Sequence, residues 1–331
     1  MVEIILNRRS FVQMALALPA ASLPAWARAA AYPGSKPIHM IVPFAAAGNV
    51  DTMARLVGAA MGPLLGTSIV VENRAGVGGG IGAGYVTRSK PDGYTLLASS
   101  NGPLTVNLFF QKNMTYDPLK DLIPLGKISD VAHVLAVNPS LPAKTLPELI
   151  KLSQQRPINV GTSGVGSATH MTLVRFVAAT GANLTHVPYK GGGALTADLV
   201  GGTLDAAFTE LSTAQPLHKS GMTRIMAIAA QNRSPLVPDV PTAIEQGVAD
   251  FIATSYVGLL VPAGTPEEVR NLVQQALAKS LDDTNVTSNI RNQGAEVAIR
   301  AERTGAGFGA FLRGEFDRSK AAVQQAGIVP E

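Results

Sequence analysis

The chain has 331 residues, which is room for about two domains. An apolar fraction of 46%, with 33 Gly and 22 Pro, is typical of a globular protein and excludes a disordered or collagen-like chain. The net charge is +4 without a basic cluster, which argues against nucleic-acid binding, and the absence of Cys excludes disulfides and Cys-based zinc sites.

The N-terminus has the features of an export signal. Arg8 and Arg9 precede an apolar stretch that Pro19 and Pro24 interrupt, and Ala27-Arg28-Ala29 supplies the small-x-small pattern of a signal peptidase site. The prolines and the short apolar run disfavour the alternative, a membrane-spanning helix. We therefore predict a signal peptide over residues 1–29, cleavage after Ala29 and a periplasmic location. The twin-arginine route and the general secretory route are both left open.

In the first part of the mature chain, strands alternate with helices. Ile38–Val42 is a short apolar run that ends at Pro43, as expected of a buried parallel strand. Further strands are predicted over Ser68–Val71 and Tyr94–Ala98, with helices over Asp51–Met61 and around Gly82–Arg88. This alternation predicts an α/β unit with a parallel sheet. After Asn107 the chain is expected to meander through Asp117-Pro118 and Pro124.

A second α/β series begins with a strand over Leu135–Val137. Thr145 and Glu148 have the spacing of a capping box at the start of a helix over Thr145–Gln155. The series continues with strands over Asn159–Gly161, Leu184–Val187, Ala206–Phe208 and Arg224–Ala229, and with helices over His170–Thr180, Ala194–Gly201 and Ala214–Ser220. A Pro-rich passage follows, then a strand over Ser255–Val261 and an amphipathic helix that Thr265-Pro266-Glu267-Glu268 caps. Two α/β units predict two lobes with a cleft between them.

Two glycine-rich loops are expected at this cleft, because ligands of open parallel sheets bind beyond the carboxyl ends of the strands. Pro43–Asp51 follows the first strand, and Gly161–Ser167 precedes the helix near His170. Small residues let backbone N–H groups at a helix N-terminus face a carboxylate or phosphate. The alternative for either loop is a plain turn with a helix cap. Two such loops favour an anion clamp, in which we expect Gly48 to approach the ligand with a positive φ.

No catalytic or metal-binding pattern is complete. Gly78-x-Gly80-x-x-Ala83 resembles a dinucleotide loop, but the acidic residue expected about 20 positions later is missing. Gly161-x-Ser163-x-Val165 lacks the last glycine of a nucleophile elbow. The five His are not spaced as metal ligands, and Asp239 and Glu245 lie in a turn-and-cap context. The sequence therefore predicts a binding protein, not an enzyme, with no cofactor and no metal.

Seven segments of the mature chain carry a family resemblance. They are Ile41–Asp51, Val70–Gly76, Pro91–Leu97, Gly164–Ser167 with His170, His186–Gly191, Pro238–Thr242 and Pro262–Pro266. In this order they resemble the tripartite tricarboxylate transporter receptor family, also called Bug receptors. The resemblance implies a two-lobed α/β periplasmic binding protein of the type II-like, flytrap kind. The implied division is a first lobe of residues 30–130 plus 233–331 and a second lobe of residues 131–232, with the ligand cleft between the lobes.

The resemblance also implies a function and a set of site residues. A receptor of this family binds a small carboxylate and delivers it to integral-membrane transporter subunits; we expect it to act as a monomer. The ligand carboxylate is held by the loop after the first strand and by ordered waters, often without an Arg. The implied ligand-binding residues are Phe44, Ala47, Gly48, Asn49, Thr162, Gly164, Val165, Gly166, Ser167, His170, Tyr189, Thr209 and Glu210.

The chain departs from the family pattern after Phe208. Thr209-Glu210 stands where the family often has Asp-Asn. The missing acidic residue at Thr209 disfavours an amino-acid ligand with a free ammonium group, and Glu210 either replaces it or points outward. A second function uses the same binding event, namely a ligand-sensing co-receptor for a membrane sensor kinase. The sequence leaves both functions open.

Overall fold

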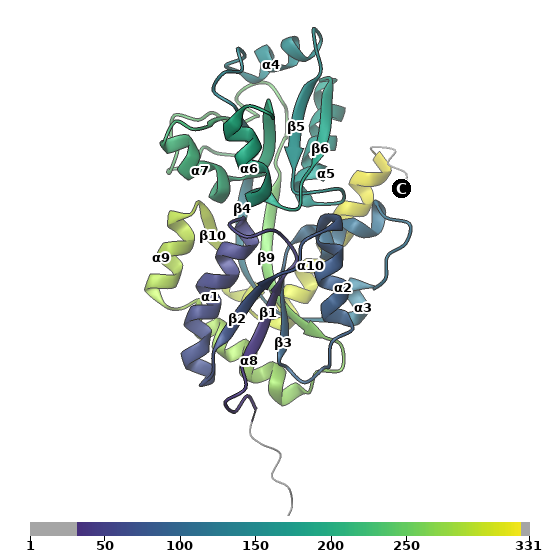
Figure 1. The fold of residues 1–331 in the computed structure, drawn as a ribbon, viewed down its shortest axis with the longest axis vertical. Coiled ribbons are helices and arrows are strands. Elements are labelled where there is room, and N and C mark those ends of the chain that lie inside the picture. The colour runs from purple at the N-terminus through teal and green to yellow at the C-terminus, as the bar shows by residue number, and fades with distance from the viewer. Residues whose placement is uncertain (1–31, 326–331) are drawn as a thin grey trace, which may run out of the picture. The chain divides into compact units, whose positions relative to one another are not determined.

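The computed structural model describes residues 32–325 of the chain. A compact unit begins at Pro33. The predicted signal peptide over residues 1–29 lies outside the described residues. Within the compact unit, Figure 1 shows two groups of elements joined by the strands β4 (Leu122–Val137) and β9 (Thr254–Pro262).

The first group is built on three parallel strands. β1 (Ile38–Val42) lies between β2 (Ile69–Asn73) and β3 (Thr95–Ser99). The connecting helices are α1 (Asn49–Leu65) and α2 (Gly80–Thr87), and 3-10 or π turns occupy Val77–Gly79, Gly102–Val106 and Asn107–Phe109. Every residue of β1 except His39 is buried, as expected of a central parallel strand. The predicted strand Ile38–Val42 is thus confirmed with its bounds.

The second group repeats this arrangement. β5 (Ile158–Thr162) lies between β6 (Leu184–Pro188) and β7 (Ala206–Glu210) and is parallel to both. The other elements are α4 (Leu146–Ser153), α5 (Ala168–Thr180), α6 (Gly192–Gly201), α7 (Leu211–Lys219) and β8 (Arg224–Ile228). The hydroxyl of Thr145 accepts from Glu148 N–H, whereas the Glu148 carboxylate accepts from Lys144 N–H. The predicted capping box therefore closes one residue earlier than expected.

Strand β4 belongs to both groups. Its first part pairs antiparallel with β9, and its last residues pair with β7 and β8. The expected irregular passage around Asp117-Pro118 and Pro124 is wrong, because α3 (Pro118–Asp121) leads directly into β4 and Pro124 lies inside the strand. The β4–β9 register shifts between Pro124 and Gly126. A proline, which has no N–H to donate, is tolerated at such a bulge.

After β9 the chain packs against the first group. This part comprises α8 (Glu267–Ser280), α9 (Thr284–Asn292), β10 (Ala295–Val297), a 3-10 turn over Arg300–Arg303 and α10 (Gly305–Gln325). The expected cap on α8 is wrong, because the Thr265 hydroxyl donates to Pro262 O and Pro266 occupies the N-cap position. The buried Lys127 of β4 forms an ion pair with Glu302 at 2.7 Å. The C-terminal segment is thereby tied to β4.

Each group has its own apolar core. Tyr256 and Phe308 lie in the core of the first group, and Phe176 and Phe208 lie in that of the second. The second core also contains Phe251, which comes from the passage between β8 and β9. This passage therefore packs with the second group, although the predicted second lobe ends at residue 232. The division into lobes itself stays a prediction.

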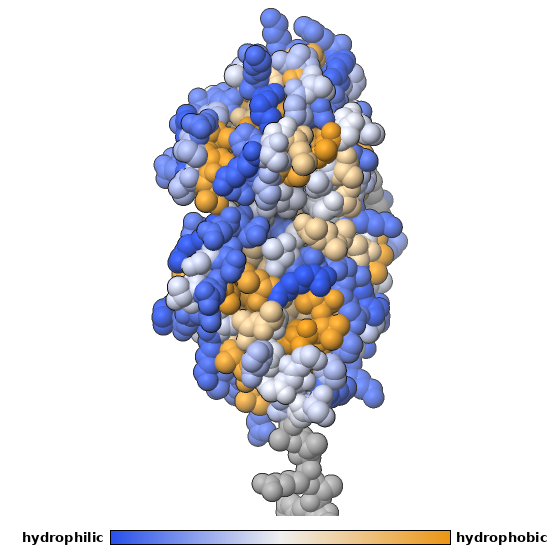
Figure 2. Space-filling view, turned by 60° about the vertical axis from the view of Figure 1, so that its left-hand side comes forward, coloured by the Kyte–Doolittle hydropathy of each residue, from blue (hydrophilic) through white to orange (hydrophobic). Residues whose placement is uncertain are grey.

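The surface carries apolar side chains singly or in small patches. Figure 2 shows a face that is mostly hydrophilic, with apolar residues in separate patches. Exposed large apolar residues such as Leu64, Ile81 and Met222 come from different parts of the chain, which is normal for a protein surface. Within residues 32–325, no helix combines the length and the apolar character needed to cross a membrane.

Candidate functional site

The loop after β1 leads into the open N-terminus of α1. Gly48 is the N-cap residue, and no side chain caps the helix there. The N–H groups of Asn49 and Val50 therefore have no hydrogen-bond partner in the described part of the chain. Gly48 has a φ of −86°, so the expectation of a positive φ is wrong. The left-handed residue is Ala47, with a φ of 61°.

Asp51 in the first turn of α1 holds this loop in shape. Its carboxylate accepts from Ala47 N–H at 2.9 Å, Arg55 Nε at 3.0 Å and Asn73 Nδ2 at 2.8 Å. Burial alone would raise the pKa of Asp51, but the hydrogen bonds from Arg55, Asn73 and Ala47 outweigh burial and lower it. The carboxylate thus stays ionised while it stabilises the left-handed conformation of Ala47.

The loop after β5 uses most of its own donors. Ser163 N–H donates to Thr169 Oγ1 at 2.9 Å, and Gly166 N–H donates to His170 Nδ1 at 3.2 Å. The N–H groups within the loop are therefore largely used, whereas the prediction placed the free N–H groups at the start of the helix. What stays open is the first turn of α5, where the N–H groups of Ala168 and Thr169 have no partner among the described residues.

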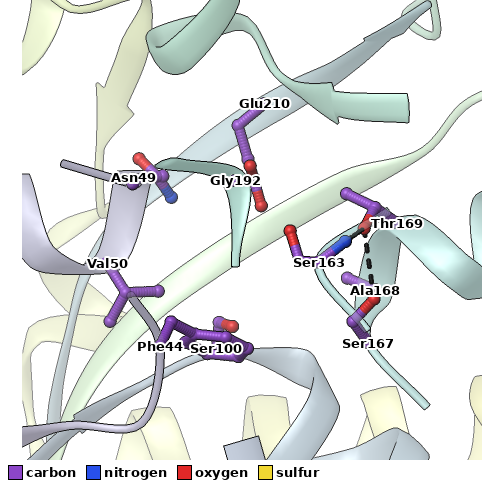
Figure 3. Close-up of a pocket in the computed structure, with 11 residues that line it drawn as sticks. Phe44, Asn49, Val50, Ser100, Ser163, Ser167, Ala168, Thr169, Gly192 and Glu210 are labelled. Atoms are coloured by element: carbon purple, nitrogen blue, oxygen red, sulfur yellow. Dashed lines mark hydrogen bonds between the residues drawn. The ribbon is translucent and has the colours of Figure 1, made fainter. Parts of the chain in front are cut away.

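The two helix N-termini meet at one cavity, shown in Figure 3. Its wall consists of Phe44, Gly48, Asn49, Val50, Ser100, Ser163, Ser167, Ala168, Thr169, Gly192 and Glu210. The cavity has a free volume of about 20 Å³, enough for about one water. The surrounding loops touch, since Ala45 N–H donates to Lys190 O at 2.9 Å. The structure therefore shows the cavity in a closed form.

Asn49 adds a side-chain donor to this wall. The residue is 4% exposed, and its Oδ1 accepts from Ser212 Oγ at 3.0 Å. Its Nδ2 is buried and has no partner in the part of the chain that the structure describes. An unpaired buried donor costs about 1–3 kcal/mol. A ligand oxygen in the cavity would supply the missing acceptor.

Among the residues that the structure describes, Glu210 is the only ionisable side chain on the wall. Its Oε1 lies 3.3 Å from Ser255 Oγ and its Oε2 lies 3.4 Å from Thr209 Oγ1. Burial raises the pKa of Glu210, and the hydrogen bonds offset only part of this effect. Among residues 32–325, no cationic side chain forms an ion pair with it. The wall thus combines hydrogen-bond donors with one acidic group that has no counter-ion.

The predicted ligand-binding residues divide into those that line the cavity and those that do not. Those on the wall are Phe44, Gly48, Asn49, Ser167 and Glu210. Those that are not part of the wall are Ala47, Thr162, Gly164, Val165, Gly166, His170, Tyr189 and Thr209. The Tyr189 hydroxyl, for example, donates to Asp198 at 2.5 Å. Ligand contact stays a prediction for all of them.

His170 and His186 hold the loop after β5 in place by hydrogen bonds. Their rings stack with centroids 4.1 Å apart, at an interplanar angle of 9°. His170 Nδ1 accepts from Gly166 N–H, and His186 Nε2 lies 2.7 Å from Thr162 Oγ1. Burial lowers the pKa of His170 to about 3 and that of His186 to about 4. Both rings are therefore neutral at neutral pH and position the loop by hydrogen bonding.

Sequence reasoning missed part of the wall. The missed residues are Val50, Ser100, Ser163, Ala168, Thr169 and Gly192. Ser163 and Ala168 lie in or next to the second glycine-rich loop. Ser100 directly follows β3, so the rule that ligands bind beyond strand ends would have found it if applied to this strand. Gly192 carries no such local signal.

The wall as a whole offers donors to an anion. The free N–H groups of Asn49, Val50, Ala168 and Thr169 lie at the positive ends of α1 and α5. The Ser163 hydroxyl points into the space between the labelled residues in Figure 3.

Within the described residues, no three His, Asp or Glu side chains are grouped so as to hold a metal ion.

Comparison with known proteins gives consistent matches. The family model of the tripartite tricarboxylate transporter family receptor matches residues 53–328. BugT from Bordetella pertussis (strain Tohama I) is 35% identical over 299 residues, which are 89% of this chain and 90% of that protein. The structure of the periplasmic binding protein BugD is 31% identical, with a TM-score of 0.86, over 89% of this chain and 99% of that chain.

Two of the similar solved structures contain a small carboxylate. MatC from Rhodopseudomonas palustris, solved with bound malate, is 30% identical, with a TM-score of 0.83, over 87% of this chain and 98% of that chain. Another Rhodopseudomonas palustris protein, solved with adipate, is 31% identical, with a TM-score of 0.85, over 91% of this chain and 100% of that chain.

These matches cover most of the chain and agree with one another. The similar structures are solute-binding proteins, not enzymes, and they share the two-lobed α/β fold. The predicted fold class and family resemblance are thus confirmed. This chain belongs to the tripartite tricarboxylate transporter receptor family and is a solute-binding receptor of the periplasmic binding protein type.

Proposed function

We propose that this protein captures a small carboxylate in the cavity between its lobes and delivers it to the membrane subunits of a tricarboxylate-type transporter. One observation carries the proposal: the open N-termini of α1 and α5 converge on a single cavity from its two sides. The malate and adipate bound to similar proteins support the carboxylate class.

Electrostatics favours an anion at this point. Each helix N-terminus has an effective charge of about half a positive unit, and its unpaired N–H groups point along the axis. Within residues 32–325 no Arg or Lys lies on the wall, so neutral donors bind the anion. Each charge-assisted hydrogen bond contributes about 1.5–3 kcal/mol. Such donors fix a carboxylate group firmly but leave the rest of the ligand less defined.

Capture requires two lobes that move relative to each other. We assign residues 33–130 and 254–325 to the first lobe and residues 131–253 to the second. The pairing of β4 with both sheets and the packing of Phe251 in the second core support this division, which moves the predicted second boundary from residue 232 to residue 253. Only a ligand that touches both loops has a higher affinity for the closed form, so its binding would shift the population toward closure.

Export and delivery complete the proposal. Arg8, Arg9 and the Ala27–Ala29 pattern support a signal peptide that is cleaved after Ala29. The description of the family as transporter receptors supports delivery to membrane subunits. We expect the mature protein to act as a monomer, which light scattering of the purified protein checks directly.

A thermal-shift screen tests the ligand class. Malate and adipate should raise the melting temperature in a concentration-dependent way, because they bind the native state and not the unfolded chain. Glucose and putrescine should leave the melting temperature unchanged. The wall offers mainly hydrogen-bond donors for an anion and no group of carboxylates that could hold an amine. Stabilisation by sugars or amines alone would contradict the proposal. Native mass spectrometry of the protein as purified from the periplasm would identify a ligand that it carries.

A further inference from the structure

A continuous series of buried polar groups runs inward from the cavity. Glu210 Oε1 lies 3.3 Å from Ser255 Oγ, and Ser255 Oγ lies 2.7 Å from His133 Nε2. His133 Nδ1 lies 2.6 Å from Thr172 Oγ1, which lies 3.0 Å from Ala168 O. All five residues are buried. The series joins β7, β9, β4 and α5, and it both starts and ends at residues of the cavity wall.

Counting hydrogens shows that this series needs one extra proton. It contains four contacts, and each requires one hydrogen. Ser255, Thr172 and a neutral His133 supply one hydrogen each, and an ionised Glu210 supplies none. With three hydrogens, one contact would bring two lone pairs together. Ser255 Oγ donates to Glu210 when the carboxylate is ionised. A fourth hydrogen on Glu210 reverses this contact and satisfies all four in one direction, from Glu210 to Ser255, His133, Thr172 and Ala168 O.

The extra proton belongs on Glu210 and not on His133. Burial and, to a smaller extent, the positive charge of Arg175 lower the pKa of His133 to about 3. Burial raises the pKa of Glu210. The groups that face Glu210 from the other elements, including Asn49 on α1 and Gly192 on α6, are uncharged. Among the described residues, no charged side chain on these elements therefore compensates an ionised carboxylate at this position, and the hydrogen bonds to Glu210 only partly offset its burial.

We propose that Glu210 is a neutral carboxylic acid in the closed cavity, and that a small carboxylate binds there together with one proton. The ligand part rests on the proposed function above. An ionised Glu210 would repel a ligand carboxylate held by the two helix N-termini, whereas a neutral one presents Oε2 as an uncharged acceptor. When the cavity opens, water solvates the carboxyl group and its proton is released at neutral pH. Closure around the anion takes the proton back.

Isothermal titration calorimetry with malate and adipate tests this, in pairs of buffers that differ in ionisation enthalpy. We expect an uptake of about one proton per bound ligand near neutral pH. The affinity should then fall by up to about tenfold per pH unit as the pH rises. Glu210→Gln should abolish both the proton uptake and this slope, because the amide cannot ionise. Glu296→Gln is the matched control, since Glu296 is an exposed residue of β10, and it should keep both.

The outcomes separate this inference from the function on which it rests. Binding of either ligand without proton uptake, or with the same uptake in Glu210→Gln, would overturn the inference and leave the proposed function standing. Failure of every carboxylate to bind would instead contradict the proposed function.

Ser255→Ala tests the positioning role of the series, because Glu210 then keeps its carboxyl group but loses its partner. The pH at which affinity declines should shift in this variant, and an unchanged profile would show that the series does not hold the proton.

Discussion

Ala45 and Lys190 are hydrogen-bonded across the edge of the cavity, with Ala45 N–H donating to Lys190 O at 2.9 Å. The two residues belong to the loops after β1 and β6. Gly193 makes this approach possible, because a Cβ atom built on it would lie only 2.0 Å from Ala46 O. The closed arrangement of these loops therefore depends on a position without a side chain.

Gly193→Ala should hinder closure. The added methyl group cannot fit while Ala46 stays in place, so the loops must separate and the closed form loses population. We expect the affinity for a carboxylate to fall by at least about tenfold, which is about 1.4 kcal/mol. The melting temperature without ligand should change little. Gly201→Ala is the matched control on the same helix, because a Cβ atom there meets nothing within 4 Å. Equal calorimetric affinities for the two variants would contradict this role.

Gly48→Val should weaken ligand binding through the first loop. A Cβ atom on Gly48 would lie 3.5 Å from Gly193 N, an ordinary contact, so alanine is tolerated. The branched methyl groups of valine extend further and cover the N–H groups at the start of α1. We expect an affinity loss of at least about tenfold, because each lost charge-assisted hydrogen bond is worth about 1.5–3 kcal/mol.

Gly93→Val serves as a contrast to Gly48→Val. Gly93 has a φ of +85°, in a turn before β3, and a β-branched residue is strained there. Its effect should therefore appear as a lower melting temperature and not as weaker binding. Calorimetric titration and thermal melts of both variants check the pair. A well-folded Gly48→Val variant that binds like the wild type would show that the anion is held elsewhere.

Local patterns were sufficient to predict most of the fold. The apolar run Ile38–Val42 and the helical spacing of apolar residues after it depend on neighbouring residues, so they could be read directly. The long strand β4 could not, because its pairing with β9 involves residues far away in the chain, and Pro124 suggests a loop unless the partner strand is known. The packing of Phe251 against the second core is a long-range contact of the same kind, which local patterns do not show.

The candidate site was predictable only in outline. The two glycine-rich loops were recognised from composition, but composition does not show which N–H groups the loop itself consumes. Gly166 N–H, for example, is taken by His170 Nδ1, whose position depends on its stacking with His186. The role of Glu210 depends on Ser255 and His133, which come from distant strands. Only tertiary packing brings these groups together.

Asn49→Ala should separate binding from stability. The substitution removes a buried Nδ2 donor that has no partner within the described residues, which stabilises the ligand-free protein. It also removes the hydrogen bond from Ser212, which destabilises it. Because the two effects oppose each other, the free energy of unfolding without ligand should change little. Carboxylate affinity should fall by about tenfold or more, because the donor is lost from the wall. Asn289→Ala on α9 is the control and should bind normally. A titration in which both variants bind like the wild type would remove Asn49 from the site.

Export should remove the only tryptophan of the chain. Trp26 lies within the predicted signal peptide, so a mature protein that begins at Ala30 contains no Trp. Periplasmic protein excited at a tryptophan-selective wavelength should therefore be nearly dark, and N-terminal sequencing should start at or near Ala30. Replacing both Arg8 and Arg9 with Lys should block export if the twin-arginine route is used. Periplasmic material that starts at Met1 would contradict the processing prediction.

Acid should destabilise the fold through its buried histidines. Unfolded histidine takes up a proton below about pH 6.5, whereas in the folded protein His133 and His170 stay neutral down to about pH 3 and His186 down to about pH 4. The unfolded state thus binds more protons in this window, so the free energy of unfolding falls as the pH is lowered below about 6.5. For the fully buried His133 the change in the free energy of unfolding approaches about 1.4 kcal/mol per pH unit.

Urea unfolding at a series of pH values measures how steeply the free energy of unfolding falls with pH. This dependence should be smaller in His186→Gln than in the control His218→Gln. Stability that stays constant or increases on acidification through this window would show that these histidines are not buried as neutral groups.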